Sequence, residues 1–383
     1  MSMPSASTLL PALLTGFFLF TPSLVPAQDP VGAKALVEEG VELHDEGKYK
    51  DAIKKYDKAL KLDQDNLEAM AEKAMTLNAL GEHEAGAALC QEIIEKHNGA
   101  REAPIVYVTY GNCMDQMGRP EASLKVYDKG ISVLPYMAML HFNKGITLSG
   151  MGPDSAASAL KCFERSARLD PFHPGTQNAM GRLLAREDRN IPATLVMCRF
   201  LILEPEGARA KDNQALLQRL LKGNVKQNAN GSTEIRVDAS MVRDSTDTVH
   251  VANDFRSEEL TWSLGNSLFD VSELTKMLND AGLQGTVTVE GSTSASGLKD
   301  KLDMLAGLLL EGRAKNHGFL WEYHGDWMIA VKDAGHTEAV AYLANASTDD
   351  KEVKSWLKEN GDKIGAYYAW EKDYSVGVLK EKH

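Results

Sequence analysis

Six side chains that could do chemistry lie between residues 317 and 338, in the C-terminal half of the chain. Histidines and carboxylates gathered in this way can bind a metal ion or exchange protons with a substrate. Their spacing matches no metal motif, because His-Glu-x-x-His is absent and a helix would place His317 and His324 about two turns apart. We therefore predict no catalytic residue, no metal and no cofactor, and interpret the six as surface or internally paired groups: His317, Glu322, His324, Asp326, His336 and Glu338.

The rest of the sequence adds no signature of catalysis. It contains no nucleophile elbow, no glycine-rich phosphate loop and no paired catalytic carboxylates. The net charge of −12 argues against nucleic acid and anionic lipid as partners. The four cysteines fall in predicted helices without a short-spaced pair, so we expect free thiols that act as small apolar residues: Cys90, Cys113, Cys162 and Cys198.

The best-defined elements lie in the N-terminal half and begin at residues 36–62, which predict two short amphipathic helices joined at Gly47. A pair of this size cannot bury its own apolar face and needs neighbours. Weaker copies follow at a period of about 34 residues, and Pro135, Pro171 and Pro205 close the last three. The residues expected to pack helix against helix are Gly40, Ala52, Tyr56, Ala59, Gly111, Tyr127, Gly145, Ala159, Phe163 and Ala193.

This pattern resembles the tetratricopeptide repeat over residues 33–207, although the fifth copy has Asp188 where a glycine is expected. The resemblance implies an all-α, right-handed solenoid of about five helix-turn-helix repeats. The expected repeats are 33–66, 67–100, 104–137, 138–173 and 174–207. Residues 208–223 carry a leucine stripe and a terminal Gly223, which favour a helix that caps the array.

The resemblance also implies a function, because the first helices of such arrays line a concave surface that binds peptide segments. Val37 and Val41 stand where chaperone-binding members carry a lysine and an asparagine, so that particular activity is not expected. Helical spacing predicts that the peptide-binding groove contains Met75, Asn78, Asn112, Gln116, Phe142, Ile146, Arg182 and Arg186. The alternative is that these residues line a solvated groove that binds nothing.

The N-terminus carries an apolar run at residues 9–20, about as long as the core of a signal peptide and too short to span a bilayer. Small residues at Val25-Pro26-Ala27 favour cleavage before Gln28. We therefore predict a signal peptide at residues 1–27 and a periplasmic or extracellular protein. The segment before the run has no lysine or arginine, and an uncleaved membrane anchor is the rival interpretation.

The C-terminal half changes character. Residues 224–253 are polar and predict a linker with at most short strands. All five tryptophans lie in residues 254–383, which predict a mainly helical domain with a core of its own. Two alternatives concern smaller parts: residues 318–333 could form a strand hairpin, and the segment around Gly335 could be a diverged further repeat.

Three functions follow from these patterns. The leading hypothesis is an exported, non-enzymatic scaffold that binds a protein or peptide in the repeat groove. The second is a hydrolase or metal-dependent enzyme in the C-terminal half, which elemental analysis would test. The third is an adaptor that binds partners with both halves. The repeat pattern names no partner, because one fold serves many binding roles.

Overall fold

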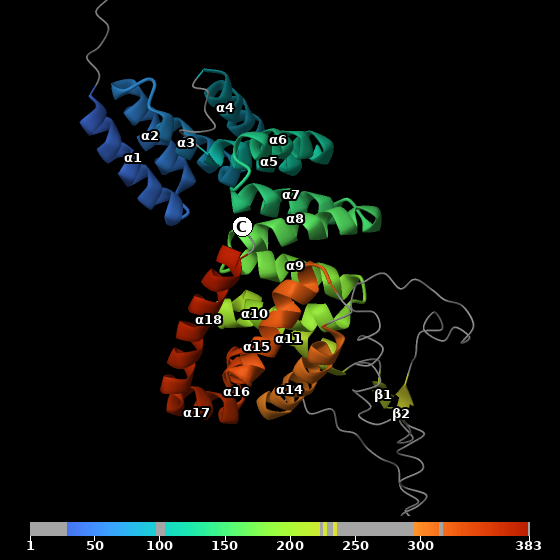
Figure 1. Ribbon diagram of the computed structural model, residues 1–383. Helices are drawn as coiled ribbons and strands as arrows, with labels where there is room; N and C mark the ends of the chain where they lie inside the picture. The colour runs from blue at the N-terminus through green and yellow to red at the C-terminus, as the bar shows by residue number, and fades with distance from the viewer. Residues whose placement is uncertain are drawn as a thin grey trace, which may run out of the picture.

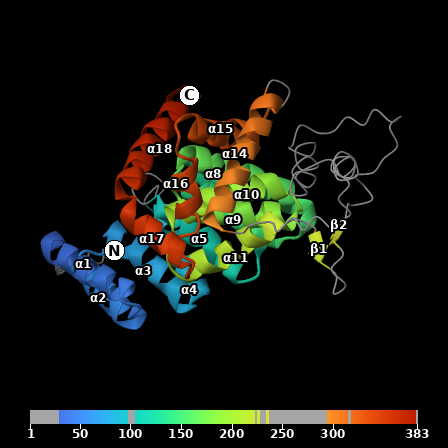
Figure 2. The ribbon, with the colours of Figure 1, turned by 90° about the horizontal axis from the view of Figure 1, so that it is seen from below.

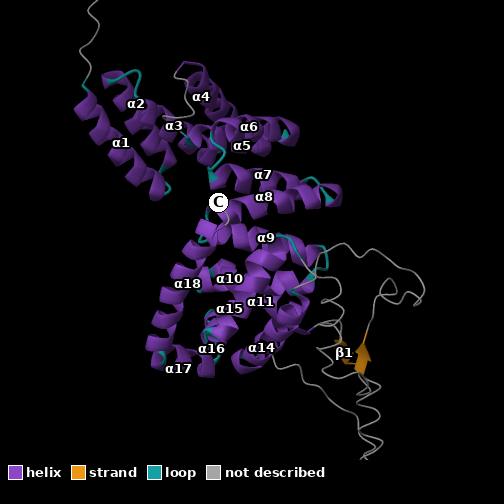
Figure 3. Ribbon diagram, viewed as in Figure 1, coloured by secondary structure: helices purple, strands orange, loops and turns teal. Residues whose placement is uncertain are grey.

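The computed structural model describes residues 29–96, 104–222, 225–227, 233–235, 294–313 and 317–381. In this part of the chain the protein is helical, apart from one antiparallel pair of three-residue strands, β1 (Val225–Gln227) and β2 (Thr233–Ile235). Figure 3 shows helices stacked from one end of the molecule to the other. The predicted all-α fold with stacked helix pairs and a helical C-terminal region is confirmed.

Five helix pairs form the N-terminal array (Figure 1). Each connection is short, and the two helices of a pair pack antiparallel on each other. The pairs are α1 (Pro30–Asp45) with α2 (Tyr49–Leu62), α3 (Leu67–Leu80) with α4 (His83–Lys96), α5 (Ile105–Gln116) with α6 (Pro120–Val133), α7 (Ala138–Gly150) with α8 (Ala156–Leu169), and α9 (Pro174–Arg186) with α10 (Asn190–Leu203). A short 3-10 turn, η1 (Pro153–Ser155), precedes α8.

A missing Cβ lets the two helices of a pair approach each other. A Cβ added to Gly145 in α7 would lie 2.6 Å from Cε1 of Phe163 in α8, closer than carbon atoms can come. Gly40 with Tyr56, and Gly111 with Tyr127, repeat this arrangement in the first and third pairs. The glycine therefore supplies the space that the aromatic ring fills. All ten residues expected to pack the repeats together are buried.

The turns within the pairs need a left-handed backbone conformation. Glycine supplies it in the first four pairs, where Gly47, Gly81, Gly118 and Gly152 have φ angles of 73°, 92°, 69° and 105°. The fifth pair reaches a similar conformation with Asp188, at φ 56°.

The helices of the array form two layers. The first helices of successive pairs contact one another, from α1 through α3, α5 and α7 to α9. We call these five helices the first-helix layer, and α2, α4, α6, α8 and α10 the second-helix layer. The predicted groove belongs to the first-helix layer.

The C-terminal helices follow the array and fold back onto it. They are α11 (Ala208–Lys222), α14 (Ala295–Gly312), the π-helical turn η2 (Leu320–Gly325), α15 (Asp326–Asp333), α16 (Thr337–Leu343), α17 (Lys351–Glu359) and α18 (Gly361–Glu381). In Figure 1, α18 runs beside the end of the array toward α8, and Figure 2 shows the same group from below.

The core is divided among the first three pairs and continuous through the rest. Separate clusters of buried residues serve the first three pairs, centred on Tyr56, Ile93 and Tyr127. One large cluster joins α8, α9, α10, α11 and the C-terminal helices. The expectation that the C-terminal half has its own core is therefore wrong, because its apolar residues pack on the fifth pair. Only a small cluster around Tyr342 and Val353 is separate.

Helix α10 shows this sharing most clearly. Every residue from Ile191 to Ile202 is buried, although the other helices of the array are amphipathic or only partly buried. Its sequence, NIPATLVMCRFLIL, is apolar on nearly all sides, which is typical of a helix surrounded by protein. In the other helices of the second-helix layer, the outer side remains exposed. In α10 the C-terminal helices cover that side.

Several smaller expectations can now be compared with the structure. Residues 318–333 form η2 and α15, so the hairpin alternative is wrong. Gly335, at φ 75°, joins α15 to α16 in a helix-turn-helix. The predicted signal peptide lies outside the described residues, as does part of the region predicted to be mainly helical.

Candidate functional site

The six histidines and carboxylates of residues 317–338 do not converge. Glu338 accepts hydrogen bonds from Lys363 at 2.6 Å and from Trp356 at 3.2 Å. Asp326 pairs with Arg313 at 3.0 Å, and Glu322 lies 3.8 Å from Arg168. His336 packs against the rings of Tyr367 and Trp370, and His317 is exposed. Across the described ranges, no group of three or more histidine, cysteine or acidic side chains is placed to hold a metal ion.

His324 is the one member of this set with an unusual environment. It is completely buried between Phe319 and Tyr323, and neither ring nitrogen has a hydrogen-bond partner among the described residues. Burial, and then the positive charge of Arg199, hold the pKa of His324 well below its ordinary value. A neutral imidazole enclosed by aromatic rings is a core residue and has no access to a substrate.

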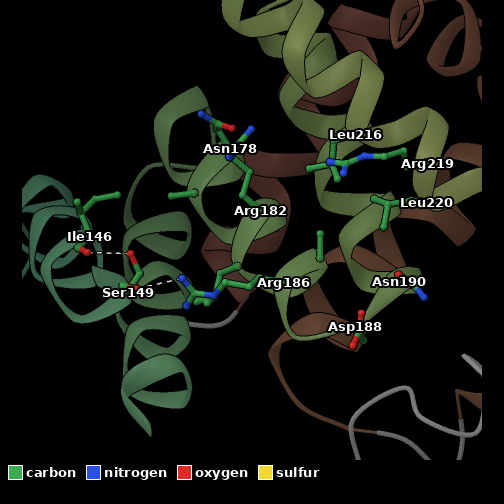
Figure 4. Close-up of a pocket in the computed structure, with 13 residues that line it drawn as sticks. Ile146, Ser149, Asn178, Arg182, Arg186, Asp188, Asn190, Leu216, Arg219 and Leu220 are labelled. Carbon is green, nitrogen blue, oxygen red and sulfur yellow. Dashed lines mark hydrogen bonds between the residues drawn. The ribbon is translucent and has the colours of Figure 1, made fainter. Parts of the chain in front are cut away.

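A concave feature lies instead on the first-helix layer, at its C-terminal end. It is a cavity of about 830 Å³ lined mainly by residues of α7, α9 and α11. Figure 4 shows the residues that line it. They are Ile146, Ser149, Asn178, Ala179, Arg182, Leu183, Ala185, Arg186, Asp188, Asn190, Leu216, Arg219 and Leu220.

Helical spacing explains why these side chains meet. Asn178, Arg182 and Arg186 are four residues apart on α9 and therefore share one face. The floor is apolar because Leu216 and Leu220 come from the leucine stripe of α11, and Ile146 from α7 keeps 39% of its surface exposed. The lining of the cavity thus combines apolar side chains with charged ones.

Three guanidinium groups give the cavity a positive character. Arg186 Nη1 donates to the backbone oxygen of Ser149 at 3.1 Å, as Figure 4 shows, and Arg182 Nη1 donates to Asn213 Oδ1 at 3.2 Å. These bonds orient the side chains and leave most of their five N–H donors for a ligand. Arg219 is exposed on α11. Asp188 is the single carboxylate in the lining, and Glu187, outside the lining, lies 3.5 Å from Arg186 Nε. The lining itself therefore carries more positive than negative charge, in a chain of net charge −12.

The lining also contains an unsatisfied amide. Asn178 Oδ1 is shielded from solvent and has no hydrogen-bond partner in the described part of the chain. Buried polar atoms are seldom left unpaired, because each unpaired atom costs about 1–3 kcal/mol. Because this oxygen is shielded from solvent, a ligand in the open cavity does not reach it in this conformation.

The structure separates the eight predicted groove residues into two sets. Ile146, Arg182 and Arg186 line the cavity together. Asn78 Oδ1 instead lies 2.8 Å from His83 Nδ1, and Asn112 Oδ1 accepts a hydrogen bond of 2.6 Å from the Tyr127 hydroxyl. The remaining three lie outside the cavity: Phe142 packs half-buried against Phe163 and His173, Met75 is half-buried and Gln116 is exposed.

Arg219 and Asp188 belong to the cavity although the sequence pattern did not predict them. Arg219 lies in the capping helix predicted at residues 208–223, which was assigned no part in the groove. Its three-residue spacing from Leu216 places the two side chains next to each other on that helix, and this spacing could have found it. Asp188 was noted only as a departure from the repeat.

No helix within the described residues is long and apolar enough to cross a membrane. The four thiols are free, and three of them are buried.

Comparison with known proteins identifies the repeat. Residues 40–72 match the TPR repeat family. Among solved structures, a thermophilic TPR protein of Thermus thermophilus is 18% identical with a TM-score of 0.43, over 49% of this chain and 98% of that one. PilF of Pseudomonas aeruginosa is 22% identical with a TM-score of 0.43, over 50% and 84% of the two chains. PilW, a type IV pilus biogenesis factor, is 18% identical with the same coverage and TM-score. No curated protein matches the chain.

Proposed function

We propose that this TPR repeat protein is a non-catalytic scaffold that binds an acidic segment of a partner protein in the cavity between α7, α9 and α11. TPR scaffolds typically serve protein–protein interaction, and the fold is usually non-catalytic. The observation that supports this site is the presence of Arg182, Arg186 and Arg219 in one lining together with apolar side chains.

The chemistry of the lining favours a carboxylate ligand. Guanidinium groups bind carboxylates with two parallel hydrogen bonds, and such charge-assisted bonds contribute about 1.5–3 kcal/mol each. The apolar floor would take an aliphatic side chain next to the acidic one.

The C-terminal helices after α11, from α14 to α18, do not line the cavity. They contact the second-helix layer, where the Tyr323 hydroxyl donates to Ala167 O of α8 and the Tyr368 hydroxyl donates to Ile202 O of α10. They also contact α11, through Lys301 and Asn345. The first-helix face of α7 and α9 is the face that lines the cavity.

A peptide-display selection against the full chain tests the proposal. Selected peptides should be enriched in aspartate and glutamate, and the double variant Arg182→Gln, Arg186→Gln should lose at least about tenfold in affinity, as expected for the loss of one or more charge-assisted bonds. The control is Arg119→Gln, Lys125→Gln, which removes the same charge from two exposed positions, one just before α6 and one within it. Equal loss in both variants would show that only net charge matters and would refute the site.

We also propose that the protein is exported, on the strength of the apolar run at residues 9–20 and the small residues before Gln28. Expression of the full chain followed by cell fractionation and N-terminal sequencing tests this. A mature N-terminus at Gln28 in the exported fraction is expected. Full-length chain in the cytoplasmic fraction would contradict it.

A further inference from the structure

The turn between α9 and α10 departs from the other turns within pairs. Four preceding pairs use glycine at a positive φ, whereas Asp188 adopts φ 56°. A side chain at such an angle is disfavoured because Cβ approaches the following carbonyl oxygen, and glycine avoids that penalty. Asp188 is the only described residue other than glycine with a positive φ.

The position of Asp188 links this strain to the cavity. Its side chain is exposed and lines the cavity with the three arginines (Figure 4). No hydrogen bond or ion pair of its carboxylate occurs among residues 29–96, 104–222 and the other described segments. The Asp188 carboxylate in this turn therefore makes no contact, within the described segments, that would stabilise the fold. Strained residues of this kind gather at binding sites.

The charge also acts against a purely acidic ligand. A carboxylate in the wall repels an incoming carboxylate and reduces the attraction of the arginines. It favours a ligand only if that ligand brings a positive group to the same end of the cavity. The arginines and Asp188 together give the lining both positive and negative charge. This combination is complementary to a peptide segment that has an acidic and a basic residue.

We infer that Asp188 is a specificity-determining residue, which accepts a lysine or arginine side chain of the partner segment while the arginines hold a neighbouring acidic one. This inference rests on the proposed function. It narrows the partner from acidic segments in general to segments with an acidic and a basic residue close together.

Three pools of synthetic hexapeptides with blocked ends provide the test, random at all positions except the fixed ones and without other charged residues. One pool fixes a glutamate, the second fixes a glutamate and a lysine one to three residues later, and the third fixes glutamine in place of both. Retention of each pool is measured on the immobilised full chain. The wild type should retain the glutamate–lysine pool about fivefold better than the glutamate pool, the most that a partly exposed ion pair provides.

Asp188→Asn and Asp188→Gly should lose the preference for lysine and keep the preference for glutamate. The matched control is Asp154→Asn, an exposed carboxylate near the corresponding turn of the fourth pair and outside the cavity. Persistence of the lysine preference in Asp188→Asn would overturn the inference, as would its absence from the wild type. If the wild type does not prefer glutamate to glutamine, the proposed function itself fails, and the inference fails with it.

Thermal unfolding of Asp188→Asn separates binding from folding. Because asparagine keeps the shape of the side chain and tolerates the left-handed angle, its unfolding midpoint should equal that of the wild type. A lowered midpoint would show that the carboxylate serves the fold, which also overturns the inference.

Discussion

The guanidinium of Arg199 donates a hydrogen bond of 2.7 Å to Oε1 of Glu371, where both side chains are almost fully buried. The two residues lie on α10 and α18, so the bond joins the last helix of the array to the last helix of the chain. The indole of Trp327 donates to the other carboxylate oxygen at 2.6 Å, and Ser375 donates to Oε1 at 2.9 Å. Tyr323 and Trp327 stack on the guanidinium. The pair is thus fully enclosed by polar and aromatic partners.

Removing one charge of this pair should destabilise the protein strongly. Glu371→Gln leaves the buried guanidinium without its counter-ion, and such changes cost about 3–5 kcal/mol. Denaturant unfolding followed by tryptophan fluorescence measures the loss. Asp51→Asn is the control, because it breaks an ion pair of 2.8 Å with Lys54 that is exposed to solvent and should contribute little to stability. A small effect of Glu371→Gln would contradict the assigned role.

A methyl group at Gly145 should disrupt the fourth pair. The Cβ of Gly145→Ala would overlap the ring of Phe163, and overpacking of this kind costs about 1–3 kcal/mol. Gly150→Ala, on the same helix, meets no atom within 4 Å and should be neutral or stabilise by up to about 1 kcal/mol. Chemical denaturation of both variants tests this contrast. Equal stabilities would refute the close-packing role of Gly145.

His324 should make the protein less stable in acid. The folded state keeps the imidazole neutral, since its pKa is held well below the ordinary value of 6.5, whereas the unfolded chain takes up a proton near that value. The stability that depends on this group is therefore complete above pH 6.5 and falls as the pH drops, by up to about 1.4 kcal/mol per pH unit.

His324→Leu should reduce this slope between pH 6.5 and 5. It should also stabilise the protein at pH 7 by about 1 kcal/mol, because it removes two buried nitrogens that lack partners. The histidines with lowered pKa elsewhere, His141, His173 and His336, remain in the variant and account for any residual slope. An unchanged slope in denaturation experiments across this range would contradict the prediction.

The cysteines should differ in reactivity. Burial raises the pKa of Cys113 to about 11 and that of Cys198 to about 12, and both thiols are inaccessible. Cys162 is only partly buried and should react first with a thiol reagent at pH 8. Cys162→Ala should abolish the fast phase, and denaturant should expose the remaining thiols. A fast phase that survives Cys162→Ala would contradict this order.

Local patterns predicted the array well. Glycine, alanine and aromatic residues at repeated spacing pack neighbouring helices against each other. Their positions in the sequence therefore predict the helix pairs directly. The same spacing placed Ile146, Arg182 and Arg186 on one side of the first-helix layer, and all three line the cavity.

The remaining errors concern contacts between distant segments. Asn78 and Asn112 are directed toward the right layer, but their amides bond to His83 and Tyr127, which spacing within one helix does not reveal. Arg199 and Glu371 are 172 residues apart, and nothing near either residue identifies its partner. The sequence of α10 is apolar on nearly all sides. This pattern could have predicted that another part of the chain covers the helix.

The division of the core has a consequence for local stability. The first three pairs hold separate small clusters, whereas the fourth and fifth share one continuous core with the C-terminal helices. Local opening should therefore cost less free energy in the first three pairs than in the fourth and fifth. Hydrogen exchange of the backbone amides should accordingly be faster in α1 to α6 than in the helices that line the cavity.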